Sequence, residues 1–138
     1  MKIPFKKLYQ NSVAPFRKNK GDAAFDLTVH SMEPWDNCAV MFRSGIAVEI
    51  PEGYFGLIRP RSSMAMSRYV VGASGVIDSS YRGEIMFCLK NMGCGTDYAV
   101  GDRFCQIMIL PLPSVDYVEV SELSETSRGE GGFGSTGR

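Results

Sequence analysis

Short apolar or alternating runs, divided by turn residues, constrain the fold of this chain more than any other feature. The runs are FDLTV (25–29), AVMFRSGIAVEI (39–50), YFGLIRP (54–60), GEIMFCLKN (83–91), RFCQIMILPL (103–112) and VDYVEV (115–120). Turn signals separate them at Pro34, Pro51-Glu52-Gly53, Gly93 to Gly95 and Gly101-Asp102. No stretch of about 11 residues keeps a helical period. We therefore expect a single all-β domain, a sandwich or a barrel, with one or two helical turns at SSMAMSRY (62–69).

Length and charge limit what such a chain can do. A domain of 138 residues has a core but little room for a deep active site of its own, so a site shared between subunits is plausible. Fifteen basic and fifteen acidic side chains cancel, which argues against a nucleic-acid polymer or a membrane surface as the main partner. No apolar run approaches the roughly 20 residues of a membrane span, and the first ten residues lack a signal-peptide core. We expect an intracellular, soluble protein.

The cysteines and the single histidine do not suggest a metal site or a nucleophile. Cys38, Cys88, Cys94 and Cys105 form no C-x-x-C pair, and His30 has no partner motif. We interpret the cysteines as small, reduced packing residues.

The C-terminal segment SRGEGGFGSTGR (127–138) is rich in glycine and follows the polar linker SELSETS (121–127). Its glycines imitate the dinucleotide fingerprint and the P-loop, but no helix can follow them and the P-loop lysine is missing. Two interpretations remain: a disordered tail, or an arm whose guanidinium, N–H groups, hydroxyls and aromatic ring cover a phosphate chain and its base. We therefore divide the chain into a domain, 1–126, and an arm, 127–138.

Two stretches combine charge with turn chemistry. In GDAAFDL (21–27), Asp22 and Asp26 are either turn residues or carboxylates that hold a hydrated cation. In RPRSSMA (59–65), the two serines at an expected helix start form either an anion site with Arg61 or a plain helix cap beside a surface arginine. Between the two arginines we favour Arg61 over Arg59.

Two further stretches carry polar residues among apolar ones. GVIDSSYRGEI (75–85) is a hairpin candidate with Asp78 and Tyr81 at its tip, either a general base beside a sugar-packing ring or an ordinary turn. In GDRFCQIMI (101–109), Gln106 interrupts an apolar strand and needs partners, which are either backbone groups or a ligand or hydrated metal. We assign Asp102 and Arg103 to the turn that begins this strand.

In their order along the chain, these pieces resemble the five motifs of the trimeric dUTP pyrophosphatases (dUTPases). GDAAFDL, PRSSMA, GVIDSSYRGEI, GDRFCQ and RGEGGFGSTG cover nearly the whole chain, and the third and fifth are very specific. The resemblance implies a jelly-roll-like β subunit and a homotrimer whose sites take motifs from all three chains. It also implies Mg²⁺-dependent hydrolysis of dUTP to dUMP and pyrophosphate, which limits uracil in DNA and supplies dUMP for dTMP synthesis.

The resemblance further implies a role for each matching residue. Asp78 would be the general base that activates the water attacking the α-phosphate, and Arg128 would contact the phosphates. Asp26 and Gln106 would hold waters of the Mg²⁺, and Tyr81 would pack beneath the deoxyribose. The other implied substrate-binding residues are Arg61, Ser62 and Ser63 at the phosphates, Gly75, Val76 and Met86 at the uracil edge, and Phe133, Gly134, Ser135 and Thr136 in the arm.

Departures from the motifs and rival interpretations stay open. Ala24 and Ser63 stand where the family usually has glycine, and Cys105 where it usually has alanine. Of these, Ser63 bears most on the site, because its side chain would lie near the expected phosphates. The rivals are a dCTP deaminase, which shares the β fold, a regulatory protein that uses dUTP as a signal, and a structural jelly roll, which would not need the arm.

Overall fold

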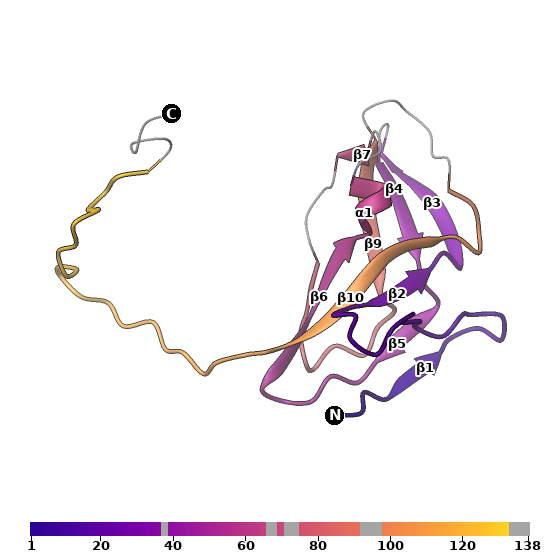
Figure 1. Cartoon of the computed structure of the whole chain (residues 1–138), viewed down its shortest axis with the longest axis horizontal. Helices are drawn as coiled ribbons and strands as arrows, with labels where there is room; N and C mark the ends of the chain where they lie inside the picture. Colours follow the sequence, from indigo (N-terminus) through magenta and orange to yellow (C-terminus); the bar gives the residue numbers. More distant parts are fainter. Residues whose placement is uncertain (37–38, 66–68, 71–74, 92–97, 133–138) are drawn as a thin grey trace.

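The structure, a computed structural model, describes residues 1–36, 39–65, 69–70, 75–91 and 98–132, and in these ranges it is almost wholly β (Figure 1). Its strands are β1 (Phe5–Lys7), β2 (Phe25–Thr28), β3 (Ser31–Asp36), β4 (Ala39–Arg43), β5 (Ile46–Val48), β6 (Tyr54–Pro60), β7 (Tyr69–Val70), β8 (Val76–Ile77), β9 (Met86–Asn91) and β10 (Arg103–Pro111). A single helical turn, α1 (Ser62–Ala65), follows β6. No helix in the described part of the chain is long and apolar enough to span a membrane.

Two four-stranded sheets form the body of the domain. The first has the strand order β2-β10-β6-β8 and the second the order β3-β4-β9-β7, and every pairing is antiparallel. The short strands β1 and β5 form a separate pair. The sheets therefore confirm the sandwich prediction, with β10 at the centre of the first sheet because it pairs with β2 on one side and β6 on the other.

The core lies between the sheets and follows the alternation seen in the sequence. In β6, Ile58 is buried whereas Leu57 and Arg59 point away from the core. The rings of Phe42 from β4 and Phe104 from β10 are fully buried and stacked, with their centroids 5.4 Å apart. This contact joins the two sheets, so the first sheet, which carries the cleft described below, is held against the second.

Three sequence predictions were wrong in detail. Pro34, read as a turn signal, lies in β3 opposite Val40, which is possible because β3 is an edge strand with a bulge after Pro34. The run 115–120, predicted as a strand, has no regular structure in this chain. The stretch 75–85 is not a hairpin: β8 pairs with β6 in the first sheet and β9 with β4 in the second, so the segment crosses between sheets.

Candidate active site

A cleft of about 570 Å³ opens beside β2, β10 and the residues that follow β6. The register places Gln106 of β10 opposite both Asp26 of β2 and Arg59 of β6. Paired residues on neighbouring antiparallel strands project to the same face of a sheet, so Asp26 and Gln106 share the outer face while Cys105 is buried on the other. Four residues predicted to bind phosphate or metal line this cleft together: Asp26, Arg61, Ser62 and Gln106.

Gln106 has the backbone partner that one of its two interpretations requires. Its Nε2 donates a hydrogen bond to the carbonyl oxygen of Pro60 at 3.2 Å, which orients the amide. The side chain is half-buried and also lines the cleft. Because one N–H of the amide is bonded to the backbone, the amide oxygen and the second N–H of Gln106 are left for a ligand or a hydrated ion.

Asp26 is the electrostatic centre of the cleft. Its Oδ1 lies 3.1 Å from Nε of Arg61, and its Oδ2 lies 3.0 Å from Nη1 of Arg103. The Asp26 side chain is 17% exposed, so the pairs are only partly screened by water. Both carboxylate oxygens are therefore occupied by arginines in this structure.

Arg103 also lines the cleft, which the sequence did not reveal. Its assignment to the turn was wrong, because its guanidinium reaches Asp26, 77 positions away along the chain. Asp102 does behave as predicted: its Oδ2 accepts a hydrogen bond from the backbone N–H of Ala99 at 2.9 Å.

Further charges border the cleft and give it an excess of positive charge. Arg17, Lys18, Arg61 and Arg103 line it together with the carboxylates of Asp22 and Asp26. The Arg17 guanidinium lies 4.7 Å from the centre of the Phe25 ring and donates to the carbonyl oxygen of Asp22 at 3.3 Å. Four cations against two carboxylates suit a polyanionic ligand.

Asp22 belongs to a turn. Its Oδ2 accepts a hydrogen bond from the backbone N–H of Asn19 at 2.8 Å. This bond, followed by the side-chain bonds of Asn19, lowers the pKa of the Asp22 carboxyl. The turn interpretation of Asp22 is therefore favoured over cation binding.

The helical turn α1 begins at Ser62, so Ser62 and Ser63 lie in its first turn and not before it. Both serines are exposed, but only Ser62 lines the cleft. The predicted phosphate contact of Ser63 thus receives less support than that of Ser62.

The residues of the third motif lie elsewhere. Asp78 is exposed just after β8, and the backbone N–H of Tyr81 donates to its carbonyl oxygen at 3.1 Å, which closes a turn. Val76 is exposed, the carbonyl oxygen of Gly75 accepts from the N–H of Ile58 at 2.9 Å, and Met86 begins β9. These residues form a second group, at the crossover between the sheets.

One chain does not bring the two groups together. Ile77, next to Asp78, pairs with Gly56 of β6, whereas Arg61 follows the other end of that strand. At about 3.3 Å per residue, the five steps from Gly56 to Arg61 correspond to about 16 Å. The backbones of Asp78 and Arg61 in one chain are therefore separated along β6 by much more than a hydrogen bond.

The chain leaves the two sheets after β10, ahead of the arm expected at 127–138, and Figure 1 shows residues 112–132 running away from them. Arg128 is exposed, and its Nε donates to the carbonyl oxygen of Gly131 at 2.8 Å. The predicted arm residues Phe133, Gly134, Ser135 and Thr136 lie outside the described residues. Within the chain, therefore, Arg128 is not placed at either group.

The donors of the cleft suit a magnesium ion that arrives with a triphosphate. Among the described residues, no three His, Cys, Asp or Glu side chains cluster to hold a metal. Mg²⁺ keeps several waters and is commonly bound through one or two carboxylates together with substrate phosphates. Asp26 and Gln106, a carboxylate and an amide on one face, fit that arrangement.

Known sequences of one family match this chain. The model of the dUTPase family matches residues 10–137. A deoxyuridine 5'-triphosphate nucleotidohydrolase of Hydrogenobaculum sp. is 41% identical over 147 aligned positions, covering 99% of each chain. One from Anaplasma marginale is 48% identical over 115 positions, covering 80% of this chain and 74% of the relative.

Solved structures agree in fold. The dUTPase of Staphylococcus bacteriophage 80alpha, solved with dUpNHpp, has a TM-score of 0.81 at 27% identity and covers 99% of each chain. A mutant dUTPase from phage phi11 of S. aureus, described with a structural Mg(II) ion, shares the fold with a TM-score of 0.76 at 23% identity, over 91% of this chain and 100% of that one. With a family match over residues 10–137 and relatives of this similarity, the chain belongs to the dUTPase family of dUTP diphosphatases.

Proposed function

We propose that the protein hydrolyses dUTP to dUMP and pyrophosphate by attack of a water molecule on the α-phosphate. The observation that carries the proposal is the cationic cleft in which Asp26, Arg61 and Gln106 converge, in a chain of this family. Such a reaction keeps uracil out of DNA and supplies dUMP for dTMP synthesis.

Asp78 is the general base in this proposal. Its carboxylate is exposed at a turn, where it can accept a proton from the attacking water once substrate is bound. Arg61 and Ser62, with Ser63 beside them, bind the phosphates. Arg61 must exchange the Asp26 carboxylate for a phosphate oxygen, and Asp26 keeps its second partner, Arg103, when Arg61 leaves.

The base and the sugar are recognised at the crossover between the sheets. Backbone groups of Gly75, Val76 and Met86 read the uracil edge, and cytosine would leave groups unpaired at a cost of about 1–3 kcal/mol each. Tyr81 packs beneath the deoxyribose and leaves no room for a 2′-hydroxyl, which rejects UTP. Selectivity then depends on the position of one ring and of the backbone around it.

The arm completes the site. Phe133 lies over the uracil, Gly134 lets the backbone approach, Ser135 and Thr136 bind the terminal phosphate, and Arg128 contacts the phosphates. Closing the arm expels water from the site.

Asp26 and Gln106 are the residues that would hold a hydrated Mg²⁺ at this cleft. The ion supplies charge neutralisation at the triphosphate, so that negative charge developing during attack is offset.

We also propose a homotrimer in which each site takes Asp78, the cleft and the arm from different chains. Two observations support it: the separation of Asp78 from Arg61 within a chain, and the exposed apolar side chains that follow β10. Val115, Tyr117, Val118 and Leu123 are all strongly exposed, and an apolar surface of that kind is typical of a segment buried by another subunit.

Pyrophosphate release from dUTP, dCTP, dTTP and UTP tests the activity, with the intact chain and Asp78→Asn compared in Mg²⁺. Release from dUTP alone that collapses in Asp78→Asn supports the proposal, and absence of release from all four nucleotides refutes it.

Mixing two inactive variants tests the shared site. Asp78→Asn and Arg61→Ala chains are unfolded, mixed in equal amounts and refolded. If each site combines Arg61 of one chain with Asp78 of its neighbour, about one quarter of the sites in randomly mixed trimers contain both residues. Activity that stays at the level of the separate variants would contradict a shared site.

A further inference from the structure

Glu84 is a nearly buried carboxylate to which the proposed mechanism gives no role. It lies between Gly83 and Ile85 in the segment that crosses from β8 to β9, and its side chain is 8% exposed. Burying a carboxylate is costly unless its oxygens are paired. Both oxygens of Glu84 are paired, and both pairs lead to the corner between β4 and β5.

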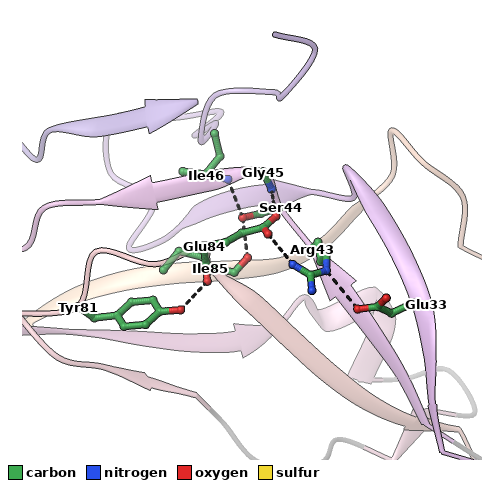
Figure 2. A network of polar contacts seen from close by, with 8 residues as sticks. All are labelled: Glu33, Arg43, Ser44, Gly45, Ile46, Tyr81, Glu84 and Ile85. Atoms are coloured by element: carbon green, nitrogen blue, oxygen red, sulfur yellow. Dashed lines mark hydrogen bonds and ion pairs between the residues drawn. The ribbon is translucent and has the colours of Figure 1, made fainter. Parts of the chain in front are cut away.

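Figure 2 shows this anchor. Oε1 of Glu84 accepts a hydrogen bond from the backbone N–H of Gly45 at 2.7 Å, and Oε2 lies 2.9 Å from Nη1 of Arg43. Arg43 also reaches Glu33, at 3.2 Å, but Glu33 is half-exposed and lies away from the crossover. The Glu84 side chain therefore ties the crossover segment to a fixed corner of the second sheet.

The backbone of the same residue holds Tyr81. The Tyr81 hydroxyl donates a hydrogen bond to the carbonyl oxygen of Glu84 at 3.0 Å, as Figure 2 also shows. The ring lies against Gly83, where a Cβ would come within 2.9 Å of Cε2 of Tyr81 and closer still to its hydroxyl. The position of the ring is thus set by Gly83 and by the orientation of the Glu84 peptide.

A separate set of bonds attaches Ile85, the residue that follows Glu84. The backbone N–H of Ile85 donates to the carbonyl oxygen of Ile46 at 2.8 Å, and Oγ of Ser44 donates to the carbonyl oxygen of Ile85 at 2.7 Å. Ile85 is fully buried. The carbonyl of Glu84 and the N–H of Ile85 belong to one planar peptide, so Ile46 holds that peptide from its far side. Removing the Glu84 carboxylate therefore leaves Ile85 attached and loosens only the backbone before this peptide, from Tyr81 to Glu84.

We propose that Glu84 is a positioning residue that fixes the Tyr81 ring and so sets the discrimination between a deoxyribose and a ribose. The inference rests on the proposed function of Tyr81 as the floor beneath the sugar. Arg43 and Gly45 act with Glu84 by holding its carboxylate, so the selectivity of the site depends on contacts outside the substrate pocket.

The test compares kcat/KM for dUTP and for UTP in the full chain and in Glu84→Ala, Glu84→Gln and Glu33→Gln. We expect the dUTP/UTP ratio to fall about tenfold or more in Glu84→Ala, since a displaced ring no longer excludes the 2′-hydroxyl. Glu84→Gln keeps an acceptor for the N–H of Gly45 but loses the ion pair with Arg43. Its dUTP/UTP ratio should therefore lie between those of the unaltered chain and Glu84→Ala. Glu33→Gln is the matched control: it also removes a carboxylate from Arg43, and its ratio should match that of the unaltered chain.

Two further variants separate this inference from the proposed role of Tyr81. Tyr81→Phe removes only the hydroxyl that donates to the carbonyl oxygen of Glu84. It should therefore also lower the dUTP/UTP ratio. Tyr81→Ala should abolish most of the discrimination; if it does not, the sugar role of Tyr81 fails. If Tyr81→Ala lowers the ratio but Glu84→Ala does not, the positioning role of Glu84 is overturned.

Circular dichroism shows whether each variant is folded. If Glu84→Ala does not fold, Glu84→Gln and Tyr81→Phe decide the question, and unchanged ratios in both overturn the proposal.

Discussion

The guanidinium of Arg103 lies 3.0 Å from the carboxylate of Asp26, opposite the arginine predicted to bind phosphate. Asp26 is thereby shared between two cations, Arg61 and Arg103. Because Arg103 also neutralises the Asp26 carboxylate, Arg61 can leave Asp26 and bind a triphosphate while the partly buried carboxylate keeps one ion pair. We therefore predict that Arg103 assists substrate exchange.

Replacing Arg103 by Gln should therefore weaken substrate binding. Asp26 would then have Arg61 as its one remaining partner, and this ion pair would hold Arg61 away from the phosphates. We expect KM for dUTP to rise about three- to tenfold. The free energy of unfolding should fall by about 1 kcal/mol or less. Arg59→Gln is the control, because in the described residues Arg59 makes no ion pair although it lies on the same face. Equal KM values for the two variants would refute this role.

Gly45→Ala should destabilise the fold more than Gly53→Ala. Both glycines have positive φ, +67° and +79°, so both substitutions cost about 1–2 kcal/mol of backbone strain. A Cβ at Gly45 would also collide with Oγ of Ser12 and lie 3.1 Å from Cγ of His30, adding about 1–3 kcal/mol, whereas nothing lies within 4 Å at Gly53. Urea unfolding at fixed protein concentration measures both losses, and equal values would show that the Ser12 contact relaxes freely.

Polar substitutions in the segment after β10 should affect assembly and not the fold of the subunit. Tyr117 and Leu123 are almost wholly exposed in the single chain, so Tyr117→Ser with Leu123→Ser removes no contact described within it. If another subunit buries these side chains, dissociation into single chains should begin at protein concentrations at least about tenfold higher. Sedimentation over a dilution series measures this.

The matched control for that pair is Glu119→Gln with Glu122→Gln, two exposed polar residues of the same segment. A control that dissociates as readily as the apolar pair would show that the effect is one of charge or of chain conformation.

Cys105 should make stability fall at high pH. Burial, and next the negative charge of Asp26, raise the pKa of its thiol well above the ordinary value of 9.0. Above pH 9 the unfolded chain releases this proton while the folded chain keeps it, so the unfolding free energy should decrease as pH rises there and be unaffected by this group below it. Comparing the slope between pH 9 and 10.5 with that of Cys105→Ala checks the prediction; identical slopes would exclude a contribution from the thiol.

Local pattern predicted much of the first sheet. The runs 25–29, 54–60 and 103–112 became β2, β6 and β10, since period-two burial and flanking turns are properties of neighbouring residues. The run 115–120 has the same pattern but no strand beside it in this chain, and a pattern cannot reveal whether a partner exists. The hairpin prediction for 75–85 was wrong for a related reason: β8 and β9, at the two ends of this crossover, each pair with a strand distant in sequence.

The site was predictable to a different degree. Asp26, Arg61 and Gln106 were identified through the order of the motifs, and the structure brings them into one cleft. Arg103 escaped because its partner lies 77 positions away, a distance that local reasoning cannot bridge. The catalytic roles of Asp78 and Arg128 stay predictions, since they depend on how several chains assemble.

Strand β10 has an evolutionary consequence. It carries Gln106 beside the cleft and buries Cys105 and Ile107 on its other face. It ends at Pro111, and residues 112–126 then lead to the arm. One inserted residue inside β10 would invert its faces and turn core side chains toward water. An insertion between 112 and 126 meets no strand register at all. Lineages descending from this gene should therefore vary in the reach of the arm while keeping the length of β10 constant.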